Sequence, residues 1–169
     1  MARAVKSDPY HNFRYQVKAT KAGALDPLGS PLAGFSACSI PDQSLEIAEY
    51  KEGTMVYSRK FPGNVKVSDI TLSRGVASND TEFWAWINQA TKGGEYRIDL
   101  EIHQFHRTDV TNQDNFANLS AKRIIKCLEC LPMHVKVGSD MESTANDVSI
   151  QELGIAMESF SITNSLTSA

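Results

Sequence analysis

The chain has 169 residues, of which 41% are hydrophobic and 22% are charged. These values are typical of an ordinary globular protein and are sufficient for one core, so we expect a single domain over residues 1–169. The formal net charge of −3 gives no basic excess of the kind that nucleic-acid-binding domains carry. No apolar run is long enough to span a membrane, and the first residues have no apolar stretch typical of a secretion signal.

Alternation of apolar and polar side chains is the dominant pattern in the first half of the chain. Residues 1–10 are polar and are predicted to form an N-terminal extension, and residues 25–31 are rich in turn-forming residues. Alternating runs, each of which predicts a half-buried strand, lie at residues 13–19, 35–40, 45–50 and 65–73.

Residues from about 45 to 64 are predicted to form a long protruding hairpin or loop. The segment 50–64 joins two strand-like runs, yet it has few residues of the kind that become buried. Connections of this length are usually functional or disordered. Charges of both signs accompany Met55, Tyr57 and Phe61 here, which are unusual residues to leave in water over so polar a stretch.

One segment departs from the alternation and predicts a helix over about residues 80–91. Asn79 and Glu82 have the spacing of a capping box. Apolar residues then recur at helical spacing, and two consecutive glycines at positions 93 and 94 end the pattern.

Both tryptophans of the chain lie in this predicted helix. Phe83, Trp84 and Ile87 share a face at helical spacing, so we expect Trp84 to be buried against the rest of the domain. Trp86 points in a different direction, where it would cover the mouth of a barrel or contact another subunit.

The clearest strand of the sequence covers residues 96–105. Its apolar positions are expected to point into the core, while the intervening polar positions point outward: Arg97, Asp99, Glu101 and His103. We leave open whether this polar face lines a water-filled lumen or meets ordinary solvent.

Two longer alternating segments complete the fold prediction. One covers residues 124–137 and is interrupted at Pro132, and the other covers residues 148–162, before a polar tail over 164–169. With residues 111–115 as a further loop, the chain has about seven or eight strands, which predicts an antiparallel β-barrel or sandwich with one flanking helix.

Metal and redox chemistry are not expected. Cys127 and Cys130 form a single CxxC within a strand-like run, and residues three apart on a strand point to opposite faces. Cys38 makes the total odd, which argues against a disulfide framework. His103 and His106 have the same unfavourable strand spacing.

No catalytic constellation is present either. The sequence has no nucleophile elbow, phosphate-binding loop, dinucleotide fingerprint or zinc-protease motif. We therefore expect no enzyme, no cofactor and no metal.

The order of several motifs is similar to that of the tail tube proteins of contractile phages and of phage-tail-like contractile injection systems. The similarity begins at DPYHNFRYQV and continues through AGFSACS, EIAEYKEG, FPGNVKVSDITLSRG, TEFWAWI, YRIDLEI, LPMHVKVG and VSIQELGIAMESF. The motifs are weak individually, but their order and spacing over nearly the whole chain are specific.

This resemblance implies a structural protein that forms homohexameric rings. The sheets of the subunits would join into a continuous inner barrel, and the rings would stack into the inner tail tube, a conduit for DNA or an effector. Because it has both charges and apolar residues, the protruding segment would then be a stacking arm whose charges pair across the junction.

The resemblance and the residue patterns together suggest three sets of assembly residues. The predicted ring-stacking interface consists of Glu46, Glu49, Tyr50, Lys51, Glu52, Met55, Tyr57, Arg59 and Phe61. The predicted helix-packing and intra-ring set is Phe83, Trp84, Trp86 and Ile87. The possible lumen face consists of Arg97, Asp99, Glu101 and His103.

The implied partners are further copies of the chain, the tail sheath protein, baseplate hub and tail terminator proteins, and a tape measure protein, DNA or effector in the lumen, with no membrane. The implied location is a virion tail or an injection-system particle, assembled in the bacterial cytoplasm. Two alternatives remain open: a baseplate hub or tube-initiator protein of the same fold, and a solitary β-barrel module that binds a ligand or peptide.

Overall fold

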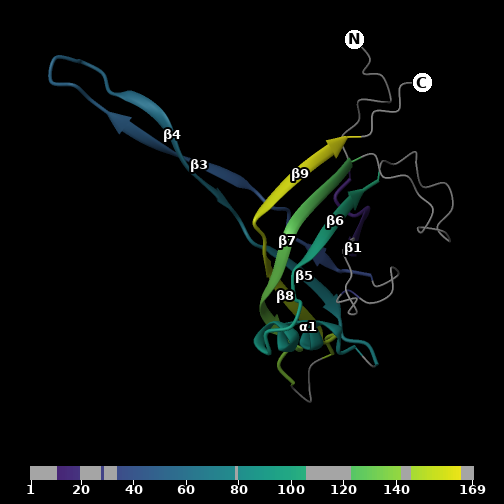
Figure 1. The fold of residues 1–169 in the computed structure, drawn as a ribbon. Coiled ribbons are helices and arrows are strands. Elements are labelled where there is room, and N and C mark those ends of the chain that lie inside the picture. Colours follow the sequence, from purple (N-terminus) through teal and green to yellow (C-terminus); the bar gives the residue numbers. More distant parts are fainter. Residues whose placement is uncertain are drawn as a thin grey trace, which may run out of the picture.

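The computed structural model describes residues 11–19, 28, 34–78, 80–105, 123–141 and 146–164. A body built around one sheet carries a two-stranded hairpin that projects far from it (Figure 1). The described elements are β1 (Tyr15–Ala19), β2 (Ala37–Cys38), β3 (Gln43–Tyr50), β4 (Arg59–Val67), β5 (Ile70–Gly75), α1 (Glu82–Thr91), β6 (Ile98–Gln104), β7 (Arg123–Lys136), β8 (Ile150–Ala156) and β9 (Ser159–Asn164). The predicted extension over residues 1–10 and, apart from Leu28, the loops expected at 25–31 and 111–115 lie outside the described residues.

The long strand β7 organises the body. Its first half, up to Cys130, pairs with β6, which in turn pairs with β1. The other edge of β7 pairs with β9 along its first half and with β8 along its second half. β8 in turn pairs with β5, and β5 pairs with β2. All pairs are antiparallel. We call the group β1, β6, first half of β7 and β9 layer A, and the group second half of β7, β8, β5 and β2 layer B.

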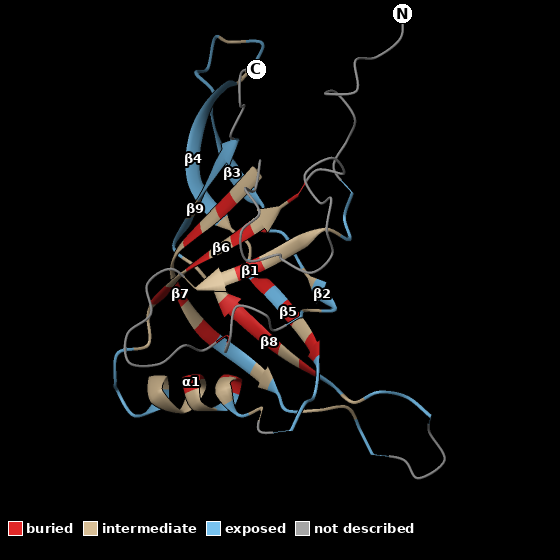
Figure 2. Cartoon of the chain, turned by 90° about the vertical axis from the view of Figure 1, so that its right-hand side faces the viewer, coloured by how far each residue is buried: buried red, intermediate tan, exposed pale blue. Residues whose placement is uncertain are grey.

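The two layers face each other across one hydrophobic core, so the predicted antiparallel, mainly β architecture with a flanking helix is confirmed. Buried side chains from layer A, such as Leu100 and Ile102, belong to the same cluster as Leu72, Leu153 and Ile155 from layer B. These residues appear as alternating red segments along the strands in Figure 2. The apolar positions predicted to point inward on 96–105 are buried or half-buried, as expected.

The sheet resembles a sandwich and does not close into a barrel. Its outer strands β1 and β2 are not paired with each other. The hydroxyl of Tyr15 donates a hydrogen bond of 2.8 Å to the carbonyl oxygen of Phe35, just before β2. This side-chain contact bridges the two layers where a ladder of backbone bonds would be needed to close a barrel.

The predicted interruption at Pro132 is wrong, because β7 runs through it. The register against β8 shifts between Pro132 and His134, and a bulge of this kind accommodates a residue that has no backbone N–H to donate. Pro132 also follows Cys130, the last residue of β7 that pairs with β6, so the missing donor falls where the strand changes partners.

The expectation that Cys127 and Cys130 point to opposite faces is also wrong. Glu129 has a φ of 52°, and the register against β6 shifts between Ile98 and Leu100. This bulge inserts one extra residue between the two cysteines, so both thiols point into the core and are fully buried.

The run 65–73, predicted as one strand, is two strands of different sheets. β4 ends at Val67 in the hairpin, and β5 begins at Ile70 in the body. Between them, the backbone N–H of Ser68 donates to the carbonyl of Asp42, and the Ser68 hydroxyl accepts from the Asp42 N–H. The predicted segment 148–162 is likewise divided, into β8 and β9, by a bend at 157–158.

The single described helix is confirmed, but its tryptophans are placed in the opposite way to the prediction. Trp86 is 1% exposed and donates from its ring nitrogen to the carbonyl of Tyr96 at 2.7 Å. Trp84 is 54% exposed. Phe83 and Trp86 define the buried stripe, because residues three apart lie on one face of a helix.

The start of the helix also differs from the expected capping box. Thr81 is the N-cap residue and makes no side-chain cap hydrogen bond. Glu82 bonds to Arg74 instead of reaching back to the helix start. Asn79 lies outside the described residues. No described helix has the length and apolarity needed to cross a bilayer.

The two tryptophans provide a direct test of this packing. Trp86→Ala should lower the free energy of unfolding of the isolated subunit by about 3–5 kcal/mol, because it empties a large buried volume. Trp84→Ala should change it by no more than about 0.5 kcal/mol, as exposed substitutions do. Urea unfolding followed by far-ultraviolet circular dichroism measures both, and equal losses would contradict the placement of the helix.

Candidate functional site

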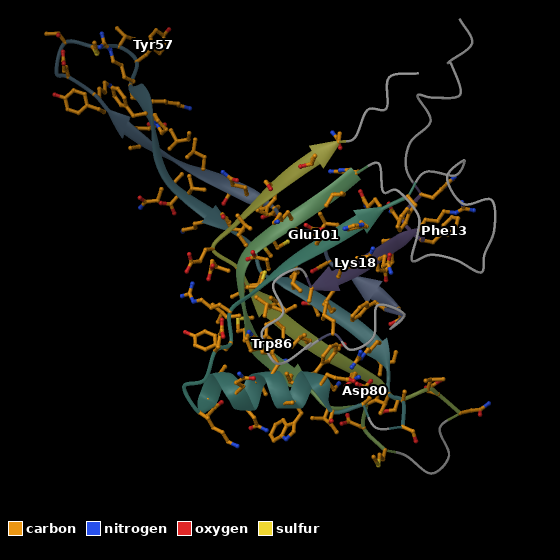
Figure 3. The ribbon with its side chains drawn as sticks, turned by 45° about the vertical axis from the view of Figure 1, so that its right-hand side comes forward. Phe13, Lys18, Tyr57, Asp80, Trp86 and Glu101 are labelled. Atoms are coloured by element: carbon orange, nitrogen blue, oxygen red, sulfur yellow. The ribbon has the colours of Figure 1, made fainter. Side chains whose placement is uncertain are left out.

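The projecting hairpin, β3 and β4 with their connecting turn (residues 43–67), is the most unusual surface of the molecule, and we call it the hairpin arm. It forms a separate two-stranded sheet, and Tyr57 lies near its tip, far from the body (Figure 3). Several of its large apolar side chains are exposed: Leu45, Ile47, Tyr50, Val56, Tyr57, Phe61 and Val65. A two-stranded hairpin with no core of its own is marginally stable in water.

The two faces of the hairpin arm have opposite arrangements of apolar and charged residues. On one face, Leu45 lies opposite Val65 near the body, and Glu49 lies opposite Lys60 towards the tip. Cross-strand partners share a face.

On the other face the order is reversed. Glu46 pairs with Lys66 near the body, and two cross-strand pairs lie towards the tip: Ala48 with Phe61, and Tyr50 with Arg59. Each face therefore offers an apolar half and a charged half, staggered between the two sides.

β4 contains a bulge within the hairpin arm. The register shifts between Leu45 and Ile47, opposite the short run that contains Gly63. A Cβ atom on Gly63 would lie 3.0 Å from the carbonyl oxygen of Glu46, which is closer than ordinary contacts allow. Any other residue here would require the two backbones to move apart slightly, which favours glycine.

The predicted stacking residues all lie on the hairpin arm, but two of their charges are already paired within it. Glu46 pairs with Lys66, and Glu49 contacts Lys60 at 3.7 Å and accepts from the Ser58 hydroxyl at 3.1 Å. Lys51 and Glu52 are exposed near the turn, where the N–H of Met55 donates to the carbonyl of Glu52. Sequence reasoning missed Leu45, Ile47 and Val65 as exposed residues because their alternation is that of an ordinary half-buried strand.

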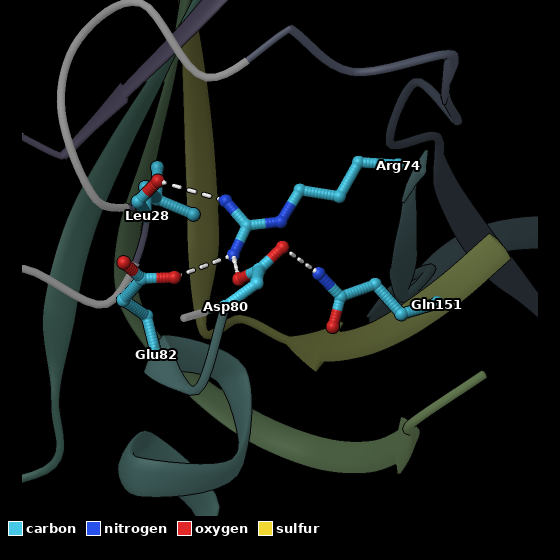
Figure 4. A network of polar contacts seen from close by, with 5 residues as sticks. All are labelled: Leu28, Arg74, Asp80, Glu82 and Gln151. Atoms are coloured by element: carbon cyan, nitrogen blue, oxygen red, sulfur yellow. Dashed lines mark hydrogen bonds and ion pairs between the residues drawn. The ribbon is translucent and has the colours of Figure 1, made fainter. Parts of the chain in front are cut away.

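A buried ion-pair network holds the start of α1 to layer B (Figure 4). Arg74 on β5 is 5% exposed and pairs with both Asp80 and Glu82. Asp80 also accepts from the side-chain amide of Gln151 on β8, and Arg74 donates to the carbonyl of Leu28 at 3.2 Å.

The Arg74 guanidinium also lies over the ring of Phe83 at 4.2 Å from its centre, a cation–π geometry. Burial is the main cause that raises the pKa of Asp80. The pKa of Glu82 is lowered, mainly by its hydrogen bond with Asp80 and also by its hydrogen bond with Arg74. The sequence carried one signal of this network: Arg74 occupies a core-facing position in the alternation after Ile70 and Leu72.

The polar face of β6 divides into two parts. At one end Glu101 lies 2.9 Å from the His103 ring nitrogen Nε2 and 3.6 Å from Lys126 of β7. It also stands opposite Lys18 of β1 in the register, and both residues are marked in Figure 3. This part of the layer A surface has cations on both sides of one carboxylate.

At the other end, Arg97 and Asp99 stabilise the bulge in β7. The Asp99 carboxylate accepts a hydrogen bond of 3.0 Å from the backbone N–H of Glu129, the residue with positive φ. Arg97 pairs with Glu158 and lies 3.6 Å from Glu129. Two of the four predicted lumen residues therefore have a structural role beside the bulge.

The cysteines form a close group in the core. The hydrogen bond with Cys127, first, and burial raise the pKa of Cys130, whereas the same hydrogen bond lowers the pKa of Cys127. Burial raises the pKa of Cys38 to about 12. Within the described ranges, no group of three or more histidine, cysteine, aspartate or glutamate residues is placed to hold a metal ion.

Comparisons with known proteins agree with this geometry. The family model described as T4-like virus tail tube protein gp19 matches residues 11–161. A comparison with curated proteins finds no significant match.

Several solved structures share the fold. A chain of the anti-feeding prophage tube-terminating cap is similar with a TM-score of 0.75 and 20% identity, over 98% of this chain and 97% of that chain. A chain of the sheath–tube complex of PVC, an extracellular contractile injection system in its extended state, has a TM-score of 0.75 and 19% identity, over 96% and 99%. A chain of the anti-feeding prophage baseplate has a TM-score of 0.73 and 16% identity, over 94% and 97%.

The buried network around Arg74 can be tested by substitution. Arg74→Met leaves the buried Asp80 carboxylate without its main partner and should lower the free energy of unfolding by about 3–5 kcal/mol. Adding Asp80→Asn to that variant should recover part of the loss, since the uncompensated charge is removed.

Arg97→Met is the matched control, because Arg97 is a half-exposed arginine in an ion pair. It should cost far less than Arg74→Met, because solvent screens an exposed ion pair. Chemical unfolding measures all three variants, and a loss for Arg74→Met no greater than that of Arg97→Met would contradict the role assigned to the network.

Proposed function

The chain belongs to the T4-like virus tail tube protein gp19 family, and from this premise we propose that it forms homohexameric rings that stack into a tail tube. The tube would be the inner conduit of a contractile phage tail or of a phage-tail-like injection system and would pass DNA or an effector. The observation that carries the stacking part of this proposal is the hairpin arm, which exposes apolar side chains on both faces.

The strand arrangement of layer A supports ring closure. Its strands follow one another in antiparallel order from β1 through β6 and β7 to β9, so β1 and β9 run in opposite directions. Both are edge strands among the strands that the structure describes, and the unpaired backbone groups of an edge readily pair with another chain. When copies are related by rotation, β9 of one copy can meet β1 of the next in antiparallel register, and a contact of this kind closes into a ring.

The polar face of layer A is our proposed lumen lining. Glu101, His103, Lys18 and Lys126 share this face, on the side away from the core. Two lysines face one carboxylate here, so this polar lining of a water-filled channel would carry a small positive excess.

Trp84 is our proposed intra-ring contact on α1. Phe83 and Trp86 already pack inside the subunit, whereas Trp84 is free to contact a neighbouring copy. Large aromatic side chains are enriched at protein interfaces, where one face of the ring remains near polar groups. Ile87, half-buried, would lie at the margin of the same contact.

The wider partners follow from the same premise. We expect the tail sheath to surround the tube, the baseplate hub and tail terminator to contact its two ends, and a tape measure protein, DNA or effector to fill the lumen. The particle would be assembled in the bacterial cytoplasm and would carry this chain as a structural component, without enzymatic activity.

Electron microscopy of the purified protein separates this function from its alternatives. Stacked rings of indefinite number support a tube subunit. Single or paired rings that do not extend support a baseplate hub or tube initiator. A monomer at high concentration, with a ligand or peptide bound, would support a solitary binding module and overturn the proposal.

The hairpin arm should report assembly by hydrogen exchange. In the isolated subunit, the amides of residues 43–67 should exchange rapidly, because the strand pair has no core and opens locally. In assembled tubes the same amides should become protected, while those of β6 change little. Protection of the hairpin arm already present in the monomer would contradict a stacking role.

A double substitution at the exposed tip should separate folding from assembly. Tyr57→Ser with Phe61→Ser should leave the free energy of unfolding within about 1 kcal/mol, because Tyr57 is largely exposed and Phe61 is about half exposed, outside the core. Tube length, measured from micrographs, should fall sharply. Every subunit of a ring makes this contact at each junction, so a small loss per subunit is multiplied by the number of subunits. Tubes of normal length would show that the apolar tip does not contribute to stacking.

A further inference from the structure

A second group of exposed apolar side chains lies at the end of layer B. We call it the distal patch: Val76, Val137, Met141, Val148 and Ile150, which are between 38% and 99% exposed. Together with the hairpin arm it accounts for most of the exposed large apolar side chains of the described residues. Apolar groups gathered on a polar surface mark interaction sites more often than isolated ones do.

Ser149 connects the segments of the distal patch through hydrogen bonds. Its carbonyl accepts a hydrogen bond of 2.9 Å from the N–H of Val76, and its hydroxyl accepts one of 3.2 Å from the N–H of Ser139. Val148 and Ile150 flank Ser149 in the sequence, and Val148 lies within 3.7 Å of the position that a Cβ on Gly75 would take. Segments from the ends of β5, β7 and β8 thus form one surface.

The distal patch and the hairpin arm lie at opposite ends of β5. β5 begins three residues after the end of β4, at Ile70, which pairs with Ile155. It ends at Gly75, which pairs with Ile150 of the distal patch. Figure 3 shows the same separation, with Tyr57 at one end of the molecule and Asp80, which follows the distal end of β5, at the other.

The charges of the two surfaces are complementary. Arg59 is exposed on the hairpin-arm face that also carries Tyr50 and Phe61, and within the described part of the chain it has no ion-pair partner. Asp140 and Asp147 are exposed beside the distal patch and have no described cationic partner. The nearest cation in sequence, Lys136, stands opposite Glu152 in the register.

We infer that the distal patch is the receptor for the hairpin arm of a second copy of this chain, with Tyr50 and Phe61 against Val148 and Ile150, and Arg59 paired with Asp147. This inference rests on the proposed function, because the second copy belongs to the next ring. Two different surfaces at opposite ends of one molecule make a head-to-tail contact, which repeats by translation and builds a filament. The charged pair sets the register, while the apolar contact contributes most of the affinity.

Charge reversal tests the contact. Arg59→Glu and Asp147→Lys, each alone, should raise the protein concentration needed for tube growth by at least about tenfold, because each places like charges together. The double variant Arg59→Glu/Asp147→Lys should recover growth to near the wild-type concentration. Lys92→Glu, an equal charge change at the end of α1, is the control and should have no effect.

Disulfide trapping provides a second, independent measurement. Tyr50→Cys and Val148→Cys in one chain, oxidised with copper phenanthroline after assembly, should yield a ladder of covalently linked subunits on a denaturing gel. Each single variant, made like the pair in a Cys38→Ser background because Cys38 is only half-buried, should yield none, since Cys127 and Cys130 are fully buried. The position of Tyr50 opposite Arg59 brings the introduced thiol close to the residue that follows Asp147.

The outcomes separate the two ideas. If the wild-type protein forms no rings or tubes, the proposed function fails and the receptor assignment fails with it. If the wild-type protein forms tubes, but the double variant does not recover growth and the cysteine pair yields no ladder, only the receptor assignment is overturned. Recovery together with the ladder supports it.

Discussion

The body of this protein depends on one strand that serves two layers. β7 pairs with β6 along its first half and with β8 along its second, and two bulges, at Glu129 and after Pro132, allow the change of partner. Because a bulge bends a strand and increases its twist, the single ladder folds back on itself and its two layers share one core. The positions of β1, β2 and β5 follow from where β7 bends.

This fold has a well-packed core, but it leaves backbone groups at strand edges unpaired and large apolar side chains exposed. Among the described strands, layer A ends in edges at β1 and β9, and no described segment covers either face of the hairpin arm. A protein selected to remain a monomer covers or shortens such features. Their presence together fits the ring-forming and stacking subunit proposed above, in which another copy would complete each of them.

Polar groups in the interior hold the parts that must keep a fixed orientation. Arg74, with two carboxylates and the ring of Phe83 around it, joins β5 to the start of α1. Charges removed from water are unfavourable unless their partners are nearly ideal, so such a cluster favours one arrangement of the helix over others. Asp99 acts similarly at the bulge, where its carboxylate binds the backbone of Glu129.

Local patterns in the sequence determined the strand content, the helix and the protruding segment, because alternation and helical spacing are properties of neighbouring residues. They correctly oriented residues 96–105, with Leu100 and Ile102 inside. They could not reveal the bulge that turns Cys127 and Cys130 to the same side, or the break that divides β4 from β5, because both depend on which strand lies alongside.

The tryptophans illustrate the same limit. Helical spacing predicts that Trp84 and Trp86 lie on different faces of a helix, but the tertiary structure decides which face packs against the sheet. In the folded protein Trp86 donates a hydrogen bond to the Tyr96 carbonyl, and the Phe83 ring contacts the Arg74 guanidinium. The distal patch could not be predicted from the sequence either, because its residues lie at the ends of three strands that are far apart in the chain. Residues distant in the chain become one surface only when long-range pairing brings them together, and that pairing is a property of the whole fold.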